Sequence, residues 1–163
     1  MDRKTPKPRA APPLPVAKQA ACIGAYFPQF RRRNPGQPTI GIWEGSLQPS
    51  AESPKYVVRI SYTVGEVPCV EVISPKIRDA APHRFAGGAL CLYFPDDCDW
   101  TSQKFIALTI IPWTASWLYF YEHWLKTGRW LGPEAPHGSR KVATQKHCNK
   151  ALQGRGRHCF HLR

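Results

Sequence analysis

YVVRISYTV, residues 56 to 64, sets the fold class of this 163-residue chain. Its residues alternate between an apolar set (Tyr56, Val58, Ile60, Tyr62 and Val64) and a polar set (Arg59, Ser61 and Thr63). Because successive side chains of a strand point to opposite faces, the alternation predicts a strand with one buried face. TIGIWEGSL (39–47) and VPCVEVIS (67–74) predict strands on either side of it, so we expect an antiparallel meander.

Helical patterns flank the meander. Residues 16–30, VAKQAACIGAYFPQF, are rich in alanine and predict a short helix that ends near Pro28. Past residue 100 the apolar period becomes helical, and Thr101 is expected to cap a helix that runs to about Ile111. Pro112 fits the first turn of a second helix, since the N–H that it lacks would be unpaired there.

Aromatic residues follow the second helix at steps of three and four, which predicts a helix that packs on the sheet with one face. Gly128 is its expected stop. The aromatic positions are Trp113, Trp117, Phe120 or Tyr121, and Trp124. The fold class that these elements predict is α+β, with an N-terminal helix, an antiparallel β-meander and C-terminal helices.

The net charge of +12 belongs to the ends of the chain. Residues 1–34 hold eight Lys and Arg against one acid, residues 138–163 hold seven against none, and residues 35–137 hold eight against ten acids. We therefore expect a disordered basic arm (1–16), one globular domain (17–137) and a basic tail (138–163). Basic ends could neutralise phosphates, but the acidic middle has no interleaved basic and aromatic residues, so a nucleic-acid partner is not favoured.

The chain start, MDRKTPKPRAAPPLP, has no apolar segment of the secretory type. A reducing cytoplasm with free thiols is therefore expected for the six cysteines. The longest uncharged run, FIALTIIPWTASWLYFY (105–121), is short for a bilayer and is interrupted by Pro112, so no membrane span is predicted.

HRFAGGALC, residues 83–91, contains the candidate nucleophile, Cys91. Gly87 and Gly88 permit close approach of the backbone, and His83 lies eight residues before the thiol. A buried, inert cysteine is the alternative. Cys98, in DDCDW, is the poorer nucleophile because the neighbouring carboxylates oppose its thiolate, and Cys69 is expected to be buried.

The tail contains five residues able to bind zinc: His147, Cys148, His158, Cys159 and His161. Their HC-x9-HC-x-H spacing departs from the usual C-x2-C or H-x3-H pairs, so a flexible basic tail is favoured over a metal site. No cofactor is expected, and no GxxxxGK[ST] loop is present to bind ATP.

The segment around Cys91 resembles the active-site region of ubiquitin-conjugating enzymes, which have a Gly three residues before the catalytic Cys, a Leu after it and a Trp further on. Gly88, Leu92 and Trp100 stand at such positions. The resemblance covers roughly residues 17–137 and implies a ubiquitin-conjugating (UBC) fold. His83 stands where that family has the Asn of a His-Pro-Asn triplet, which is thought to order the loop and stabilise an oxyanion. A histidine can also donate a hydrogen bond to such an oxygen, so His83 is either a catalytic or a structural residue.

The whole pattern more closely resembles the stand-alone ubiquitin-conjugating-like proteins of bacterial cyclic-oligonucleotide-based anti-phage signalling systems (CBASS). The shared markers are Trp43, Gly45 and Leu47; Pro82, His83 and Phe85; Leu90 to Tyr93 with Pro95; Trp100; Ile110 to Trp113; Ser116 to Leu118; Tyr121, Glu122 and Trp124; and Thr127, Gly128, Trp130, Gly132, Glu134 and His137. Glu122, His123 and His137 are candidates for secondary roles near the thiol, although solvated or packing roles are favoured.

This resemblance implies that Cys91 forms a thioester with the C-terminus of a cGAS-like nucleotidyltransferase and passes it to an amine of an acceptor protein, in antiviral defence inside the bacterial cytoplasm. A separate activating enzyme would supply the activated donor. Two alternatives stay open: a catalytically inactive UBC-like scaffold, and a basic nucleic-acid- or protein-binding module.

Overall fold

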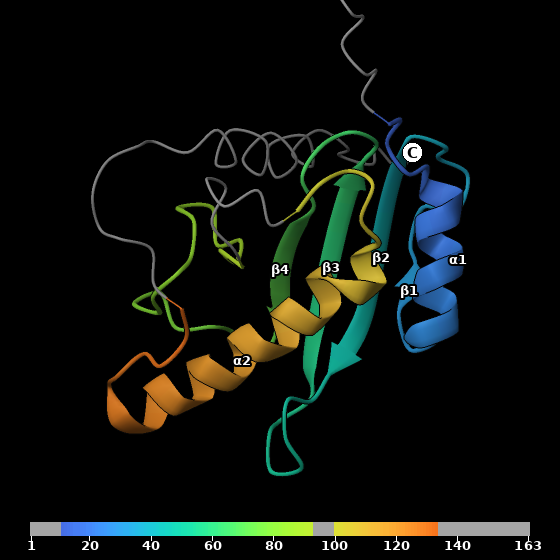
Figure 1. Ribbon diagram of the computed structural model, residues 1–163. Helices are drawn as coiled ribbons and strands as arrows, with labels where there is room; N and C mark the ends of the chain where they lie inside the picture. The colour runs from blue at the N-terminus through green and yellow to red at the C-terminus, as the bar shows by residue number, and fades with distance from the viewer. Residues whose placement is uncertain (1–10, 93–99, 134–163) are drawn as a thin grey trace, which may run out of the picture.

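The computed structural model of the chain describes residues 11–92 and 100–133. In these residues four antiparallel strands form one sheet in the order β1-β2-β3-β4 (Figure 1). The strands are β1 (Arg31–Arg32), β2 (Ile40–Leu47), β3 (Tyr56–Thr63) and β4 (Cys69–Ser74). The three longer strands confirm the predicted meander. β1 was not predicted, since two residues paired with Trp43 and Glu44 of β2 are too few to show an alternation.

One face of the sheet is buried across its three longer strands. Trp43 of β2 lies opposite Ile60 of β3, which in turn lies opposite Val70 of β4. All three side chains are almost fully buried. This register follows from the alternation, because a shift of one residue would turn every apolar side chain of β3 to the other face.

Helix α1 (Val16–Tyr26) lies beside the sheet and confirms the N-terminal helix. Val16, Gln19 and Ile23 form its buried face. The chain before α1 is also held in place: Leu14 donates its N–H to the carbonyl of Ser102 at 2.7 Å. The composition of residues 1–16 predicted a disordered arm. Residues 11–15 differ from this expectation, because their backbone forms hydrogen bonds with a distant loop. Residues 1–10 lie outside the described residues.

The helix expected from Thr101 to Ile111 is wrong. Residues 101–109 form turns and a short 3₁₀ helix, η2 (Ile106–Leu108), before helix α2 (Ile110–Thr127). The buried Gln19 side chain explains the difference, since it donates to the carbonyl of Lys104 at 3.0 Å and accepts the N–H of Ile106 at 2.9 Å. A distant side chain thus satisfies backbone groups that a local helix would otherwise have paired.

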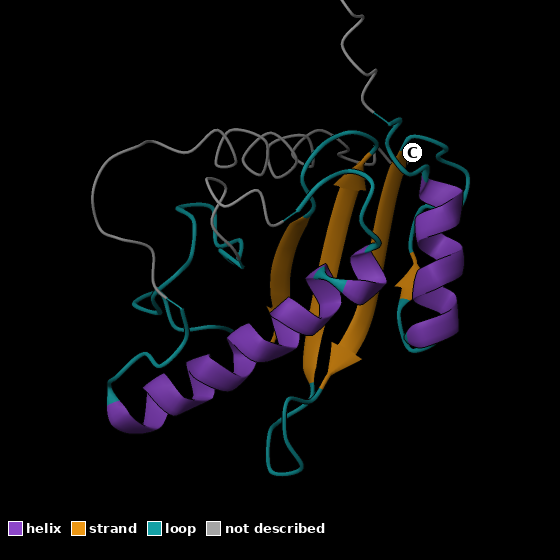
Figure 2. Cartoon of the chain, viewed as in Figure 1, coloured by secondary structure: helices purple, strands orange, loops and turns teal. Residues whose placement is uncertain are grey.

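Helix α2 crosses one face of the sheet (Figure 2). Pro112 lies in its first turn, as predicted, and Gly128 ends it in a left-handed conformation, with φ of 71° and its N–H bonded to the carbonyl of Trp124. Trp117 and Tyr121 are buried, whereas Trp113 and Trp124 are partly buried. The predicted aromatic face is therefore confirmed.

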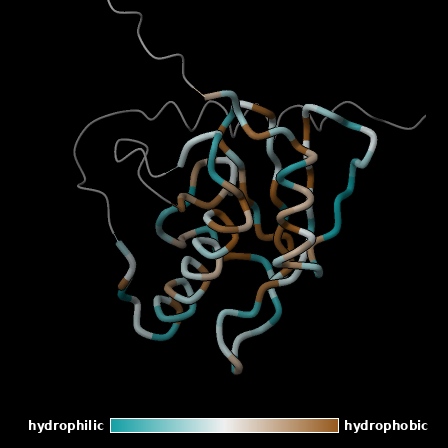
Figure 3. Tube along the Cα trace, turned by 45° about the vertical axis from the view of Figure 1, so that its right-hand side comes forward, coloured by the Kyte–Doolittle hydropathy of each residue, from teal (hydrophilic) through white to brown (hydrophobic). Residues whose placement is uncertain are grey.

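Apolar side chains of the sheet, η2 and α2 meet in one core, where Ile60, Ile106, Ile110 and Leu118 have no exposed surface. The hydropathy colouring shows these apolar segments gathered in the middle of the molecule (Figure 3). The arrangement is an α+β domain with a four-stranded antiparallel sheet. Within residues 11–92 and 100–133, no helix has the length and apolar composition needed to cross a bilayer.

Candidate active site

Cys91 and His83 lie opposite each other at the open end of a small hairpin. The backbone N–H of Cys91 donates to the carbonyl oxygen of His83 at 2.9 Å, and the next pair inward, Arg84 and Leu90, forms an antiparallel bridge. The eight-residue spacing seen in the sequence is thus the span of one hairpin. The structure brings together the two residues predicted for the site.

Glycine closes this hairpin. The N–H of Phe85 donates to the carbonyl of Ala89 at 2.9 Å, and the N–H of Gly88 returns to the carbonyl of Phe85 at 2.8 Å. Gly88 has φ of 88°, a left-handed conformation that side-chain-bearing residues rarely adopt. The glycine three residues before Cys91 is therefore required by the turn.

The hairpin is anchored on the edge of the sheet. Leu90 donates its N–H to the carbonyl of Val70 in β4 at 2.8 Å, and its side chain is buried in the main core. Ala89 is fully buried in a second cluster with Cys69 and Phe85. Cys91, the next residue, is not disulfide-bonded and is partly exposed. Its neighbours are fixed while its own side chain remains reachable from solvent.

His83 has an unusual backbone conformation, with φ of 54°. Asn, Asp and His are the residues most often found there besides glycine. Its carbonyl oxygen accepts a second hydrogen bond, from the indole nitrogen of Trp117 at 3.2 Å, and its ring packs against Trp130 with centroids 4.9 Å apart. His83 thus has one of the side chains that tolerate this backbone conformation, as Asn does.

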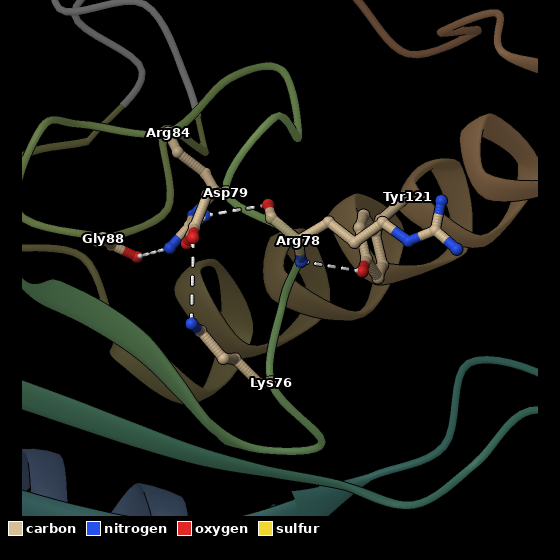
Figure 4. A network of polar contacts seen from close by, with 6 residues as sticks. All are labelled: Lys76, Arg78, Asp79, Arg84, Gly88 and Tyr121. Atoms are coloured by element: carbon tan, nitrogen blue, oxygen red, sulfur yellow. Dashed lines mark hydrogen bonds and ion pairs between the residues drawn. The ribbon is translucent and has the colours of Figure 1, made fainter.

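Arg84 ties the hairpin to the loop before it (Figure 4). Its guanidinium donates to the carbonyls of Arg78 at 3.0 Å and Gly88 at 3.5 Å, and lies 3.9 Å from the carboxylate of Asp79. The N–H of Arg78 in turn donates to the hydroxyl of Tyr121 on α2 at 3.1 Å. Sequence reasoning missed Arg84, because most of its partners are main-chain carbonyls, which leave no pattern in the sequence.

The described contacts of Glu122 lie away from the hairpin. It accepts a hydrogen bond from the Ser53 hydroxyl at 2.8 Å, in the loop between β2 and β3. Burial, and then the charge and hydrogen bonding of Glu122, raise the pKa of the Tyr56 phenol above its usual range. The packing role favoured for Glu122 thus has a concrete form: it links this loop to α2. The backbone carbonyl of His123 accepts a hydrogen bond from the Thr127 hydroxyl.

The expectation that all thiols are free is wrong at Cys69. This residue is buried, as predicted, but it is disulfide-bonded, with a partner outside the described residues. Pairing depends on which cysteines the fold brings within reach, a property that composition does not contain. Cys22 of α1 is free and partly buried, and burial raises the pKa of its thiol.

Several candidates lie outside the described residues: Cys98, His137, His147 and the zinc candidates Cys148, His158, Cys159 and His161. Among residues 11–92 and 100–133, no three His, Cys, Asp or Glu side chains gather as a metal site.

The arginine cluster 31–33 is largely engaged within the fold. Arg33 pairs with Glu44 at 2.8 Å, and Arg32 donates to the carbonyls of Gln37 and Ile40. Burial alone would raise the pKa of Glu44, but the hydrogen bonds and charges of Arg59 and Arg33 outweigh it, so the pKa lies below its usual value. Within this cluster, Glu44 therefore balances part of the positive charge of Arg33.

Comparison with known families agrees with these features. A family model described as Type II CBASS E2 protein matches residues 19–138, a span that includes the sheet, α2, His83 and Cys91. No curated protein matches the chain. Since the family match covers most of the chain, the protein belongs to the family of type II CBASS E2 proteins.

Proposed function

We propose that this protein is a ubiquitin-conjugating-like acyl carrier with a UBC fold, in which Cys91 accepts the C-terminus of a cGAS-like nucleotidyltransferase as a thioester and passes it to an amine. The observation that carries the proposal is the placement of a partly exposed cysteine, outside any disulfide, at the mouth of an anchored hairpin. Nucleophilic cysteines need such access, and a rigid surrounding keeps the sulfur in one position.

The proposed reaction has two acyl transfers. The thiolate of Cys91 attacks the activated carbonyl carbon of the donor, the sulfur–carbon bond forms, and the bond to the activating group breaks. The thiol proton goes to solvent. An acceptor amine then attacks the same carbon, the carbon–sulfur bond breaks, and the amine proton leaves as the thiolate is restored. Two easier steps replace one difficult acyl transfer.

His83 supports the second step in this proposal. Amine attack places negative charge on the thioester oxygen, and a hydrogen-bond donor held near that oxygen lowers the barrier. An imidazole N–H can donate in this way, and His83 is the residue opposite Cys91 in the hairpin.

Activation of the donor falls to another protein in this scheme. Because the chain contains no GxxxxGK[ST] loop, we assign adenylation of the C-terminus to a separate activating enzyme. The chain itself receives the activated carbonyl.

The test supplies activation chemically. The nucleotidyltransferase is prepared as a C-terminal alkyl thioester, mixed with this protein, and followed on a non-reducing gel. We expect an adduct that thiol reagents cleave, that is lost in Cys91→Ala and that persists in Cys22→Ala and Cys98→Ala. An adduct that survives in Cys91→Ala contradicts the assignment. A wild-type protein that forms a stable complex but no adduct supports the scaffold alternative.

A further inference from the structure

The chain after α2 returns to the candidate site and places Trp130 against His83. The two rings have centroids 4.9 Å apart and an interplanar angle of 39°. Trp130 also contacts two aromatic residues of α2, Trp117 at 5.5 Å and Phe120 at 5.9 Å between centroids. It therefore fills the space between the helix and the hairpin.

Two glycines make this return possible. Gly128 ends α2 in a left-handed conformation, which reverses the chain direction. At Gly132, an added Cβ would lie 2.7 Å from a ring carbon of Phe120 and 2.8 Å from the indole nitrogen of Trp130. Such distances are below van der Waals contact, so only glycine lets the segment press Trp130 this closely against the helix.

His83 is consequently held at two points by two different tryptophans. Trp117 binds its carbonyl oxygen, which fixes the backbone, and Trp130 contacts its imidazole. Holding the backbone alone leaves the side-chain torsions of a histidine free to rotate. The indole of Trp130, packed against one side of the imidazole, restricts these torsions.

The indole nitrogen of Trp130 is buried without a hydrogen-bond partner in the described part of the chain. Buried donors without partners are rare in folded proteins because their desolvation is unfavourable.

We propose that Trp130 is a positioning residue that holds the His83 imidazole in the orientation needed to assist acyl transfer from Cys91. The inference rests on the proposed function of Cys91. It makes Trp130 part of the active site, although this residue lies some 40 residues after the thiol in the sequence.

The first test separates loading from discharge. Cys91 is loaded with the donor thioester, and the rate constant for its reaction with free lysine is measured in single turnover. In Trp130→Leu we expect discharge to slow about tenfold, because a displaced catalytic group loses much of its effect, while loading stays within about twofold. Leu131→Ala, which alters the exposed neighbouring side chain, is the control and should leave both rates unchanged.

A double-mutant cycle distinguishes positioning from a general loss of stability. If Trp130 acts through His83, Trp130→Leu slows discharge in the wild-type background but adds nothing in His83→Ala. An equal additional loss in the His83→Ala background overturns the proposal. Gly132→Ala serves as the second variant, since it displaces Trp130 without removing its ring, and should reproduce the slow discharge.

NMR tests the same contact without any thioester chemistry. The ring protons of His83 should shift in Trp130→Leu, because the ring current of the adjacent indole is removed, and should stay unchanged in Leu131→Ala. Unchanged His83 resonances in Trp130→Leu overturn the inference. A wild-type protein that fails to load contradicts the proposed function instead, so the two failures are distinguishable.

Discussion

The indole nitrogen of Trp117 donates a hydrogen bond to the carbonyl oxygen of His83 at 3.2 Å, across 34 residues of sequence. The same oxygen accepts the N–H of Cys91 at 2.9 Å. One carbonyl thus connects helix α2 to both ends of the hairpin. The position of the candidate nucleophile depends on the helix that packs on the sheet as well as on its own loop.

Trp117→Phe should loosen the hairpin. The substitution removes the donor to His83 but keeps an aromatic ring beside Tyr121, with which Trp117 is stacked at 5.5 Å. We expect a loss of about 1–2 kcal/mol in the free energy of unfolding, measured with urea, for a lost hydrogen bond and a smaller ring. The amide of Cys91 should exchange faster with deuterium. Trp124→Phe trims a ring on the same helix and should leave that exchange rate unchanged; equal protection in both variants would contradict the role of the indole.

Gly45→Ala should destabilise the fold. A Cβ at this position would lie 2.4 Å from the ring of Phe30 and 2.8 Å from its Cα. Since Phe30 is buried, the clash cannot be relieved by rotation into solvent, and we expect a cost of about 1–3 kcal/mol by urea denaturation. Gly24→Ala is the matched control, because nothing lies within 4 Å of its added Cβ and α1 favours alanine. A destabilisation no greater at residue 45 than at residue 24 would be inconsistent with this packing.

Glu122→Ala should weaken the fold without affecting thioester formation. The change leaves the Ser53 hydroxyl without its acceptor and removes the charge beside Tyr56. We expect a loss of about 1–3 kcal/mol in the free energy of unfolding and a lower pKa for Tyr56, read from its ultraviolet absorbance. Loading of Cys91 at a temperature where the variant is folded should match wild type, as in the neighbouring His123→Ala. Loss of loading in a folded Glu122→Ala would instead assign Glu122 a role in catalysis.

The stability of the protein should fall at acidic pH partly through Glu44. The pKa of this carboxyl is lower in the folded than in the unfolded chain, so the unfolded state binds the proton more readily. Its stabilising contribution is present above the unfolded value of about 4.3 and is lost as pH falls through the lower folded pKa. The stabilising contribution of Glu44 is about 1 kcal/mol, because Arg33 is 58% exposed and water screens its attraction to Glu44.

Urea midpoints at pH 7 and pH 3 measure this contribution. Glu44→Gln should lower the midpoint at pH 7 and reduce the difference between the two pH values. Glu52→Gln, at an exposed carboxylate without an ion pair among the described residues, should behave as wild type. Parallel pH profiles for wild type and Glu44→Gln would show that the ion pairs contribute nothing measurable.

The candidate site was only partly accessible to sequence reasoning. Cys91, His83 and Gly88 could be named as candidates because they lie within one short segment whose spacing resembles that of ubiquitin-conjugating enzymes. The hairpin that joins them was seen only in the structure. Arg84, Trp117 and Trp130 could not be assigned their contacts. They act on main-chain carbonyls or on a ring that lies far away in the sequence.

The alanine content of residues 16–30 predicted α1, and the turn at Gly65 and Glu66 predicted β4 beside β3. Periodicity alone was sufficient for β2, β3 and the aromatic face of α2. In each of these segments the pattern of buried side chains repeats with the geometry of the element itself, so neighbouring residues contain the information. The left-handed stop at Gly128 and the turn at Gly88 are local for the same reason: they depend on the absence of a Cβ.

Contacts between distant segments settled the rest. Gln19 replaced an expected helix with turns by binding the backbone of Lys104 and Ile106. The fold joined Cys69 in a disulfide, contrary to the free thiols expected for a reducing cytoplasm. Folding also placed Trp117 against the carbonyl and Trp130 against the ring of His83. Hydrogen bonds and ring packing of this kind arise between groups that only folding brings within reach, and therefore leave no period or spacing in the sequence.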